Sequence, residues 1–199
     1  MMMDYYDIEA INQYLQARVN EVFLVCYNHP YWSMQTHENY SKLRNIWAME
    51  IYNHCSEISD GYYGYTPQVF DEMLRTGNKL FCVSVDDNHN QVNDSFGGFI
   101  VINAADLQYG SVIEAMKQGD FYSSQGPDIY EISIKDGKLL VKCSEVELIV
   151  VYTDSRVCYL KKEIGMTEAE FDISGDEGYI RIMCRDKNKR DANSNAYWI

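Results

Sequence analysis

The sequence has few basic residues for its length. It holds 17 Lys and Arg against 30 Asp and Glu in 199 residues, which gives a formal net charge of −13. Nucleic acids and anionic membranes are bound through basic surfaces, because both carry negative charge. We therefore expect no nucleic-acid partner and no membrane partner. Residues 1–126 carry most of the excess, with 16 acidic and 6 basic residues, which fits either a cation site or ordinary solubility.

Long apolar runs and paired cysteines are also missing. No run reaches the roughly 20 apolar residues of a membrane-spanning helix, and residues 1–10 lack the apolar centre of a signal peptide. The six cysteines include no CxxC pair, and they are too sparse for a disulfide scaffold. These absences predict a protein of a reducing compartment, the cytoplasm.

The residues that are present follow two patterns, and the first covers residues 1–126. Short apolar runs alternate there with helical segments, of which residues 66–77 are the best delimited. Thr66 is a good N-cap, Pro67 suits the first turn, and Gly77 suits the end of the helix. Short strands separated by helices predict a mostly parallel sheet.

The second pattern, the strict alternation of half-buried strands, covers residues 127–199. Asp136-Gly137 is a typical two-residue hairpin turn. Several short strands follow at close spacing, which predicts a small antiparallel β-sandwich. Gly126-Pro127 interrupts any regular element. We therefore expect two domains, residues 1–126 and residues 127–199.

Polar side chains gather where three successive predicted strands of the first domain end. They are Asn28 and His29 for the first strand, Glu50 through Asn53-His54 for the second, and Asp86, Asp87, Asn88 and His89 for the third. In parallel sheets the chemistry lies at the carboxyl ends of the strands. We therefore expect a functional site at this edge.

Three of these residues have side chains that bind metals. Zn, Mn and Fe accept imidazole together with carboxylate ligands. Asp87 and His89 are two residues apart, so in a strand both side chains lie on one face. Pro30 favours an extended backbone at His29, which would aim its imidazole in a fixed direction. The alternatives are a polar turn for Asp87 and His89, and a capping histidine that bonds backbone carbonyls for His29.

Two further features have two interpretations each. Glu50 either faces solvent on an edge strand or lies at the mouth of the site and pairs with a basic group, because an unpaired buried charge is costly. The aromatic loop 61–65 either flanks a substrate or packs on the surface. The chain has no Walker loop, no GxSxG and no HExxH, so no catalytic residue is assigned.

Together these motifs resemble the PHP family (polymerase and histidinol phosphatase), which are metal-dependent phosphoesterases. Residues 24–33, "LVCYNHPYWS", are similar to the family's late His-Pro strand, and residues 83–90, "VSVDDNHN", to its closing Asp-x-His motif. The segment from residue 94, "DSFGGFIVINA", resembles the tail of a bacterial subgroup. The resemblance implies an α/β, partial PHP-type (distorted TIM-like) barrel followed by a small all-β sandwich-like domain.

The resemblance also implies roles for the polar residues. His29, Asp87 and His89 match family ligands for a divalent metal (Zn, Mn or Fe). The residues expected to line the site beside them are Glu50, Asp86, Asn88 and Asn28. A small phosphoester is the expected ligand.

The sequence departs from the family at its start. PHP enzymes begin with a His-x-His strand and place further ligands before the His-Pro strand, whereas this chain contains no HxH. We therefore expect a truncated or split phosphoesterase-like protein that is weak or inactive alone and holds metal partly or not at all. One alternative is an active enzyme completed by a homo-oligomer or by a partner that supplies the missing barrel half. The other is a non-enzymatic binding module that uses the C-terminal β domain.

Overall fold

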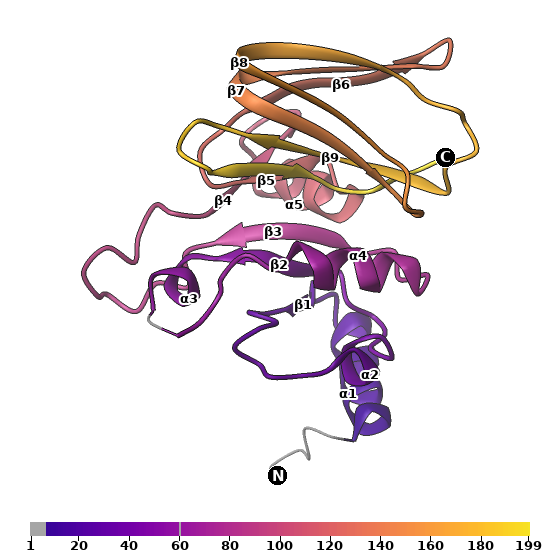
Figure 1. The fold of residues 1–199 in the computed structure, drawn as a ribbon. Helices are drawn as coiled ribbons and strands as arrows, with labels where there is room; N and C mark the ends of the chain where they lie inside the picture. Colours follow the sequence, from indigo (N-terminus) through magenta and orange to yellow (C-terminus); the bar gives the residue numbers. More distant parts are fainter. Residues whose placement is uncertain (1–6, 60) are drawn as a thin grey trace. The chain divides into compact units, whose positions relative to one another are not determined.

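The structure is a computed structural model that describes residues 7–59 and 61–199. The chain forms two compact units, residues 1–96 and residues 97–199. Figure 1 labels their helices and strands.

The first unit contains a three-stranded parallel sheet in the order β1-β2-β3. Its elements are α1 (Ile8–Asn20), β1 (Cys26–Tyr27), α2 (His37–Tyr40), β2 (Ala48–Asn53), α3 (His54–Ile58), α4 (Pro67–Arg75) and β3 (Phe81–Val85). Cys26 is in register with Ala48 of β2, which in turn pairs with Phe81 of β3. The parallel pairing agrees with the prediction from short strands alternating with helices.

The central strand β2 and helix α4 form the core of this unit. Every residue of β2 is buried, as expected for a strand that has a neighbour on both sides. Helix α4 follows Thr66, begins with Pro67 and ends before Gly77, whose φ is +86°. It contacts β2 and buries Phe70, Met73 and Leu74. The predicted start and end of this helix are confirmed.

The second unit is one antiparallel sheet of eight strands. Its elements are β4 (Phe99–Ile102), α5 (Tyr109–Gln118), β5 (Phe121–Ser124), β6 (Ile129–Lys135), β7 (Lys138–Thr153), β8 (Cys158–Asp172), β9 (Tyr179–Arg185), β10 (Asp191–Ser194) and β11 (Tyr197–Trp198). The main order is β4-β5-β10-β9-β7-β6, while β8 pairs with β7 and β11 with β9. The predicted hairpin between β6 and β7 is confirmed, and Asp136 and Gly137 both have positive φ, as that turn requires.

Irregular pairing within β7 curls this sheet around its own core. The register of β7 against β8 shifts between Lys142 and Val146 and again before Leu148. Such shifts bend a strand and increase its twist. The first half of β7 therefore pairs with β6 and the second half with β9, and Figure 1 shows the long ribbons of β7 and β8 lying over β9 and β5. The core holds fully buried side chains of Leu139, Val141, Ile149, Val151, Ile180 and Ile182.

The predicted fold class is wrong. The described chain is mostly β, with 38% strand and 21% helix, and its large sheet is an antiparallel half-barrel. The three parallel strands of the first unit form an open sheet, which is no TIM-like barrel. The sandwich-like second domain is wrong as well, because the bent β7 joins its neighbours into a single curled sheet.

The division between the two units falls after residue 96, earlier in the chain than the predicted boundary at residue 126. The strand expected to extend the parallel sheet, β4, pairs antiparallel with β5, and β5 pairs with β10 near the end of the chain. Residues 97–126 therefore belong to the second unit. Local sequence predicts that a strand forms, but the partner of that strand depends on distant residues.

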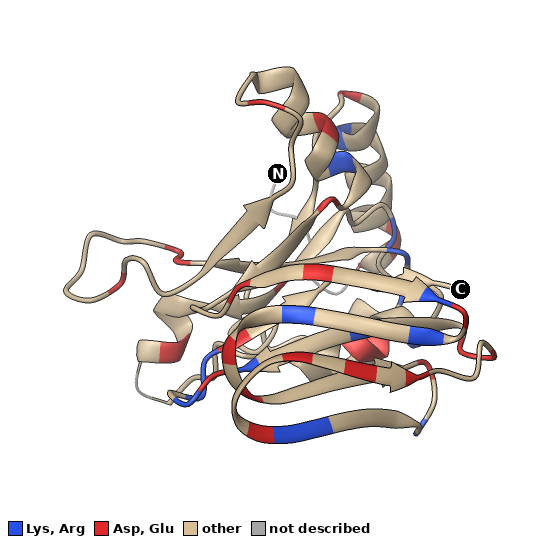
Figure 2. Cartoon of the chain, turned by 90° about the horizontal axis from the view of Figure 1, so that it is seen from above, with Lys and Arg blue, Asp and Glu red and all other residues tan. Residues whose placement is uncertain are grey.

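Charged residues of both signs are interspersed on the second unit (Figure 2). Lys138 lies 2.7 Å from Glu170 on the neighbouring strand, and Lys142 lies 2.7 Å from Glu131. Exposed pairs of this kind contribute about 0–1 kcal/mol each, so they determine the surface charge more than the stability. Among the described residues, no helix is long and apolar enough to cross a membrane.

Candidate functional site

A cavity of about 270 Å³ lies within the first unit. It is lined by His29, Trp32, Cys55, Ser56, Ser59, Tyr62, Asp87, His89 and Gln91. These residues follow the ends of β1, β2 and β3, which point the same way because the strands are parallel. The structure therefore brings His29, Asp87 and His89 to one cavity from two separate parts of the chain.

A buried amide holds the strand ends together behind this cavity. The Asn53 Nδ2 group donates to Glu50 Oε2 at 2.9 Å and to Asp87 Oδ2 at 3.1 Å. Its Oδ1 accepts the N–H of Ser56 at 2.8 Å and so caps helix α3. The Asn53 side chain is fully buried, so water does not compete for these bonds. One side chain thus links β2, the start of α3 and the end of β3.

Glu50, on the central strand β2, lies next to the backbone of His29. Its Oε2 accepts the backbone N–H of His29 at 2.6 Å as well as the Asn53 amide. Burial raises the pKa of the Glu50 carboxyl above the ordinary 4.5, and the bonds from Asn53 and His29 oppose this rise. The edge-strand interpretation of Glu50 is wrong, because β2 has a partner on each side. The carboxylate positions a backbone rather than lining the cavity.

His29 and Asp87 both have backbone conformations that are rare for residues with a side chain. Their φ angles are +29° and +50°, in the left-handed region that favours glycine. Such conformations cost of the order of 1–3 kcal/mol and are typical of functional sites. The extended geometry predicted for His29 from Pro30 is wrong, because the Glu50 carboxylate holds the His29 N–H and the His29 carbonyl accepts the N–H of Ser33 in a tight turn.

The loop after β3 is organised by Asp94, a residue that the sequence did not single out. Its Oδ2 accepts the N–H of His89 at 2.8 Å and that of Gln91 at 2.9 Å, and its Oδ1 accepts the Asn88 amide at 2.8 Å. The N–H groups of Gln91 and His89 hold the pKa of the Asp94 carboxyl below the ordinary 3.8. Asn88 therefore braces the loop and does not line the cavity.

Asp86 and Asn28 also support loops beside the cavity. Asp86 Oδ2 accepts the N–H of Phe96 at 2.6 Å. The Asn28 carbonyl oxygen accepts the Ser33 hydroxyl at 3.2 Å. Neither residue is among those that line the cavity, so their expected role as lining residues is not seen.

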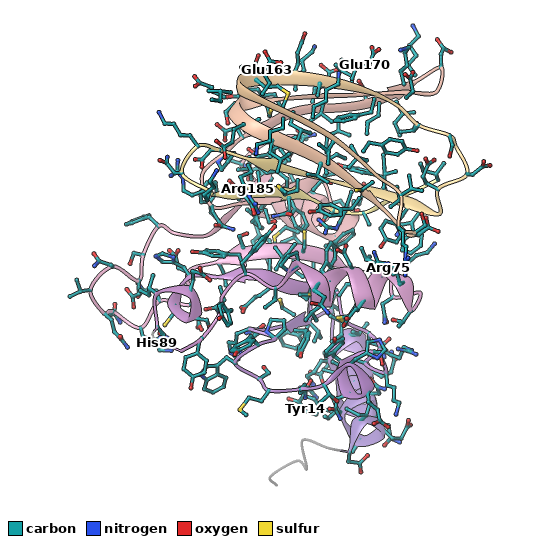
Figure 3. All side chains as sticks on the ribbon, viewed as in Figure 1. Tyr14, Arg75, His89, Glu163, Glu170 and Arg185 are labelled. Atoms are coloured by element: carbon teal, nitrogen blue, oxygen red, sulfur yellow. The ribbon has the colours of Figure 1, made fainter. Side chains whose placement is uncertain are left out.

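His89 faces a cysteine across the cavity. Its Nδ1 lies 3.5 Å from Cys55 Sγ, in the first turn of α3, and Figure 3 labels His89 close to that helix. Sequence reasoning missed Cys55, although it lies two residues after the end of β2. It also missed Trp32, two residues from Pro30, whereas Tyr62 belongs to the aromatic loop that was considered as a flank of the substrate.

The predicted metal site does not fit the structure. Residues 7–59 and 61–199 contain no group of three or more His, Cys, Asp or Glu side chains placed to hold a metal ion. The candidate ligand atoms have other partners: His29 Nδ1 lies 3.2 Å from Ser33 Oγ, Asp87 Oδ2 accepts from Asn53, and His89 Nδ1 faces Cys55. The cavity groups the side chains without arranging three of them around one ion, so the described residues do not support the predicted metal site, and partial or absent metal binding stays a prediction.

In comparisons with known proteins, no family model, no curated protein and no solved structure matches this chain. The resemblance to the PHP family therefore rests on its sequence motifs, and it stays a hypothesis.

Proposed function

We propose that residues 7–96 form the later part of a PHP-type phosphoesterase site and that the chain by itself hydrolyses phosphoesters weakly or not at all. The observation that supports the family part is the convergence of His29, Asp87 and His89 on one cavity. Their motifs are separated by more than fifty residues in the sequence. Convergence at parallel strand ends is the arrangement that a shared site requires.

The weak activity follows from the charges of the cavity. Phosphoryl transfer needs cationic groups or metal ions that neutralise the charge developing on the phosphate oxygens. The described residues that line the cavity include no Lys or Arg, and the described chain holds no metal-binding cluster. Asp87 instead presents a carboxylate, which repels a phosphate.

The test is hydrolysis of p-nitrophenyl phosphate by the purified chain, with and without added Mn²⁺ or Zn²⁺. We expect no turnover that distinguishes the wild type from Asp87→Asn. Asp136→Asn, in the hairpin of the second unit, is the matched control for charge. Robust turnover that Asp87→Asn abolishes and Asp136→Asn retains would overturn the proposal of weak activity and establish an active enzyme.

An active assembly remains the alternative expected from the sequence. Within the described residues, β1 and β3 each pair with a strand on one side only in the parallel sheet, and open edges favour pairing with another chain. We propose a homo-oligomer or a partner polypeptide that covers this sheet. Light scattering measures the molar mass, and a specific hydrolysis rate that rises with protein concentration would support completion by self-association.

A binding role for the second unit is the other candidate. The observation that favours it is a second cavity of about 260 Å³ with charges of both signs, including Glu145, Glu147, Lys187 and Arg190. A cut at Gly126 would remove β5 from the sheet, so the fragment to test is residues 97–199. If this fragment folds and retains a partner that the full chain binds, the binding role is supported; if it does not fold, the role as an independent module fails.

We also propose a reducing compartment, the cytoplasm, for this chain. All six cysteines are free thiols, and free thiols persist where glutathione and thioredoxin keep them reduced.

A further inference from the structure

We infer that the cavity of the first unit binds a small organic cation, with Trp32 and Tyr62 as aromatic contacts and Asp87 as the counter-ion. This inference is independent of the proposed phosphoesterase ancestry, because it rests on the side chains that line the cavity and requires no hydrolysis.

The aromatic side chains are placed for a ligand rather than for packing. Trp32 is 54% exposed and Tyr62 is 42% exposed, yet both line a cavity. Large exposed aromatic side chains around a concave surface are typical of ligand sites, because together they can enclose a ligand. A single aromatic side chain on a convex surface cannot. Aromatic faces attract ammonium groups through the negative charge of the π system.

Contacts between rings hold this rim in place before any ligand binds. The His29 ring meets Trp32 edge to face, with centroids 4.9 Å apart and an interplanar angle of 69°. The preceding residue, Tyr31, meets Tyr63 in the same way at 5.1 Å and 88°. The contact between Tyr31 and Tyr63 therefore joins the turn at residues 29–33 to the aromatic loop at residues 61–65. A rim that is already ordered loses less entropy when a ligand binds.

The charge of the cavity favours a cation over an anion. Asp87 is the carboxylate among the described lining residues, which include two histidines, His29 and His89, and no Lys or Arg. Residues 1–96 hold 13 Asp and Glu against 5 Lys and Arg, a balance of −8. A negative unit raises the local concentration of cations and lowers that of anions.

The remaining lining groups set the size and the polarity of the ligand. The cavity of about 270 Å³ lies just below the range of about 300–1,000 Å³ for drug-sized ligands. Ser59 donates its hydroxyl to the Cys55 carbonyl at 2.7 Å, so its oxygen can accept from a ligand hydroxyl, and Gln91 supplies an amide at the wall. A short amino alcohol with a quaternary ammonium group has this chemistry.

The test is calorimetric titration of the full chain with choline, and with 3,3-dimethyl-1-butanol, which has the same shape without the charge. We expect saturable choline binding in the millimolar range and binding of the neutral alcohol that is about tenfold weaker or absent. Trp32→Ala and Asp87→Asn should each weaken choline binding about tenfold, and Trp32→Phe less than Trp32→Ala. Asp136→Asn should leave it unchanged.

Several outcomes would overturn the inference. Equal affinities for choline and the neutral alcohol would show an apolar pocket without charge recognition. Absence of saturation by 50 mM choline, wild-type affinity in a folded Trp32→Ala variant, or tighter binding of inorganic phosphate than of choline would each exclude an organic-cation site. Circular dichroism of each variant separates a lost contact from a lost fold. Because the assay measures binding alone, its failure is distinct from a failure of the hydrolysis test.

Discussion

Removal of the Asn53 side chain is the most direct test of how the strand ends behind the cavity are held together. It is fully buried and bonds Glu50, Asp87 and the N–H of Ser56. Replacement by Ala removes all three bonds without changing any residue that lines the cavity. We therefore expect Asn53→Ala to loosen the ends of β2 and β3 together.

The magnitude follows from the burial of each partner. Loss of an Asn N-cap costs about 1 kcal/mol, which is the bond to Ser56. A buried polar group that loses a hydrogen-bond partner costs about 1–3 kcal/mol. This applies to Glu50, which keeps the N–H of His29 but loses the Asn53 amide. Asp87 is part-exposed, so water can replace its bond. We expect a loss of about 3 kcal/mol in the free energy of unfolding, a large fraction of the 5–15 kcal/mol of a typical domain.

Urea unfolding followed by tryptophan fluorescence measures this loss. In a Trp198→Phe background the signal comes from Trp32 and Trp47, which both lie in the first unit. With a urea dependence of about 1–3 kcal/mol per molar, the loss lowers the midpoint by roughly 1–3 M. If Asn53→Ala removes the cooperative unfolding transition of the first unit altogether, the loss of unfolding free energy is larger than about 3 kcal/mol.

Two comparisons make the prediction specific. Asn20→Ala changes an exposed residue at the end of α1, and we expect an effect within about 0.5 kcal/mol. Asn53→Asp keeps an acceptor for Ser56 but places a third carboxylate beside Glu50 and Asp87, so its loss should be large at pH 7 and smaller in acid. A loss below about 1 kcal/mol for Asn53→Ala would refute the view that this amide holds the strand ends together.

Three further predictions concern the same unit. Because burial raises the pKa of the Glu50 carboxyl, the folded state favours its protonated form. The stability that this group contributes is therefore lost as pH rises above 4.5 through the folded pKa. Glu50→Gln does not titrate, so the unfolding free energy of Glu50→Gln minus that of the wild type should be larger at pH 7.5 than at pH 4.5. A Cβ at Gly64 would overlap the carbonyl oxygen of Asn53 and lie 2.7 Å from the Glu57 nitrogen, so Gly64→Ala should lower the free energy of unfolding in urea by several kcal/mol. The control is Gly110→Ala, in open space within α5, which should be neutral or stabilise by up to about 1 kcal/mol. Elemental analysis of the purified chain should find well under one bound metal ion per chain, and a full equivalent that Asp87→Asn removes would contradict the absence of a metal cluster.

The sequence predicted those features that depend on neighbouring residues. The start and end of α4 follow from Thr66, Pro67 and Gly77, and the hairpin follows from Asp136-Gly137. It also predicted that the three polar strand ends lie at one edge, since parallel strands end on the same side. For this reason the sequence predicts that His29, Asp87 and His89 lie near one another.

The tertiary structure decided which contacts the residues at those strand ends make. The burial of Glu50 depends on β1 and β3 flanking β2, and the strain at His29 and Asp87 depends on bonds to Glu50 and Asn53. The bend of β7 decided that residues 97–199 form one curled sheet, to which β4 and β5 belong. Periodicity and turn chemistry are properties of adjacent residues, so the sequence by itself determined the elements and the edge at which the polar residues meet. Strand order, burial of charge and the directions of side chains arise from contacts between distant residues, and only the folded chain determined that these residues line a cavity without forming a metal site.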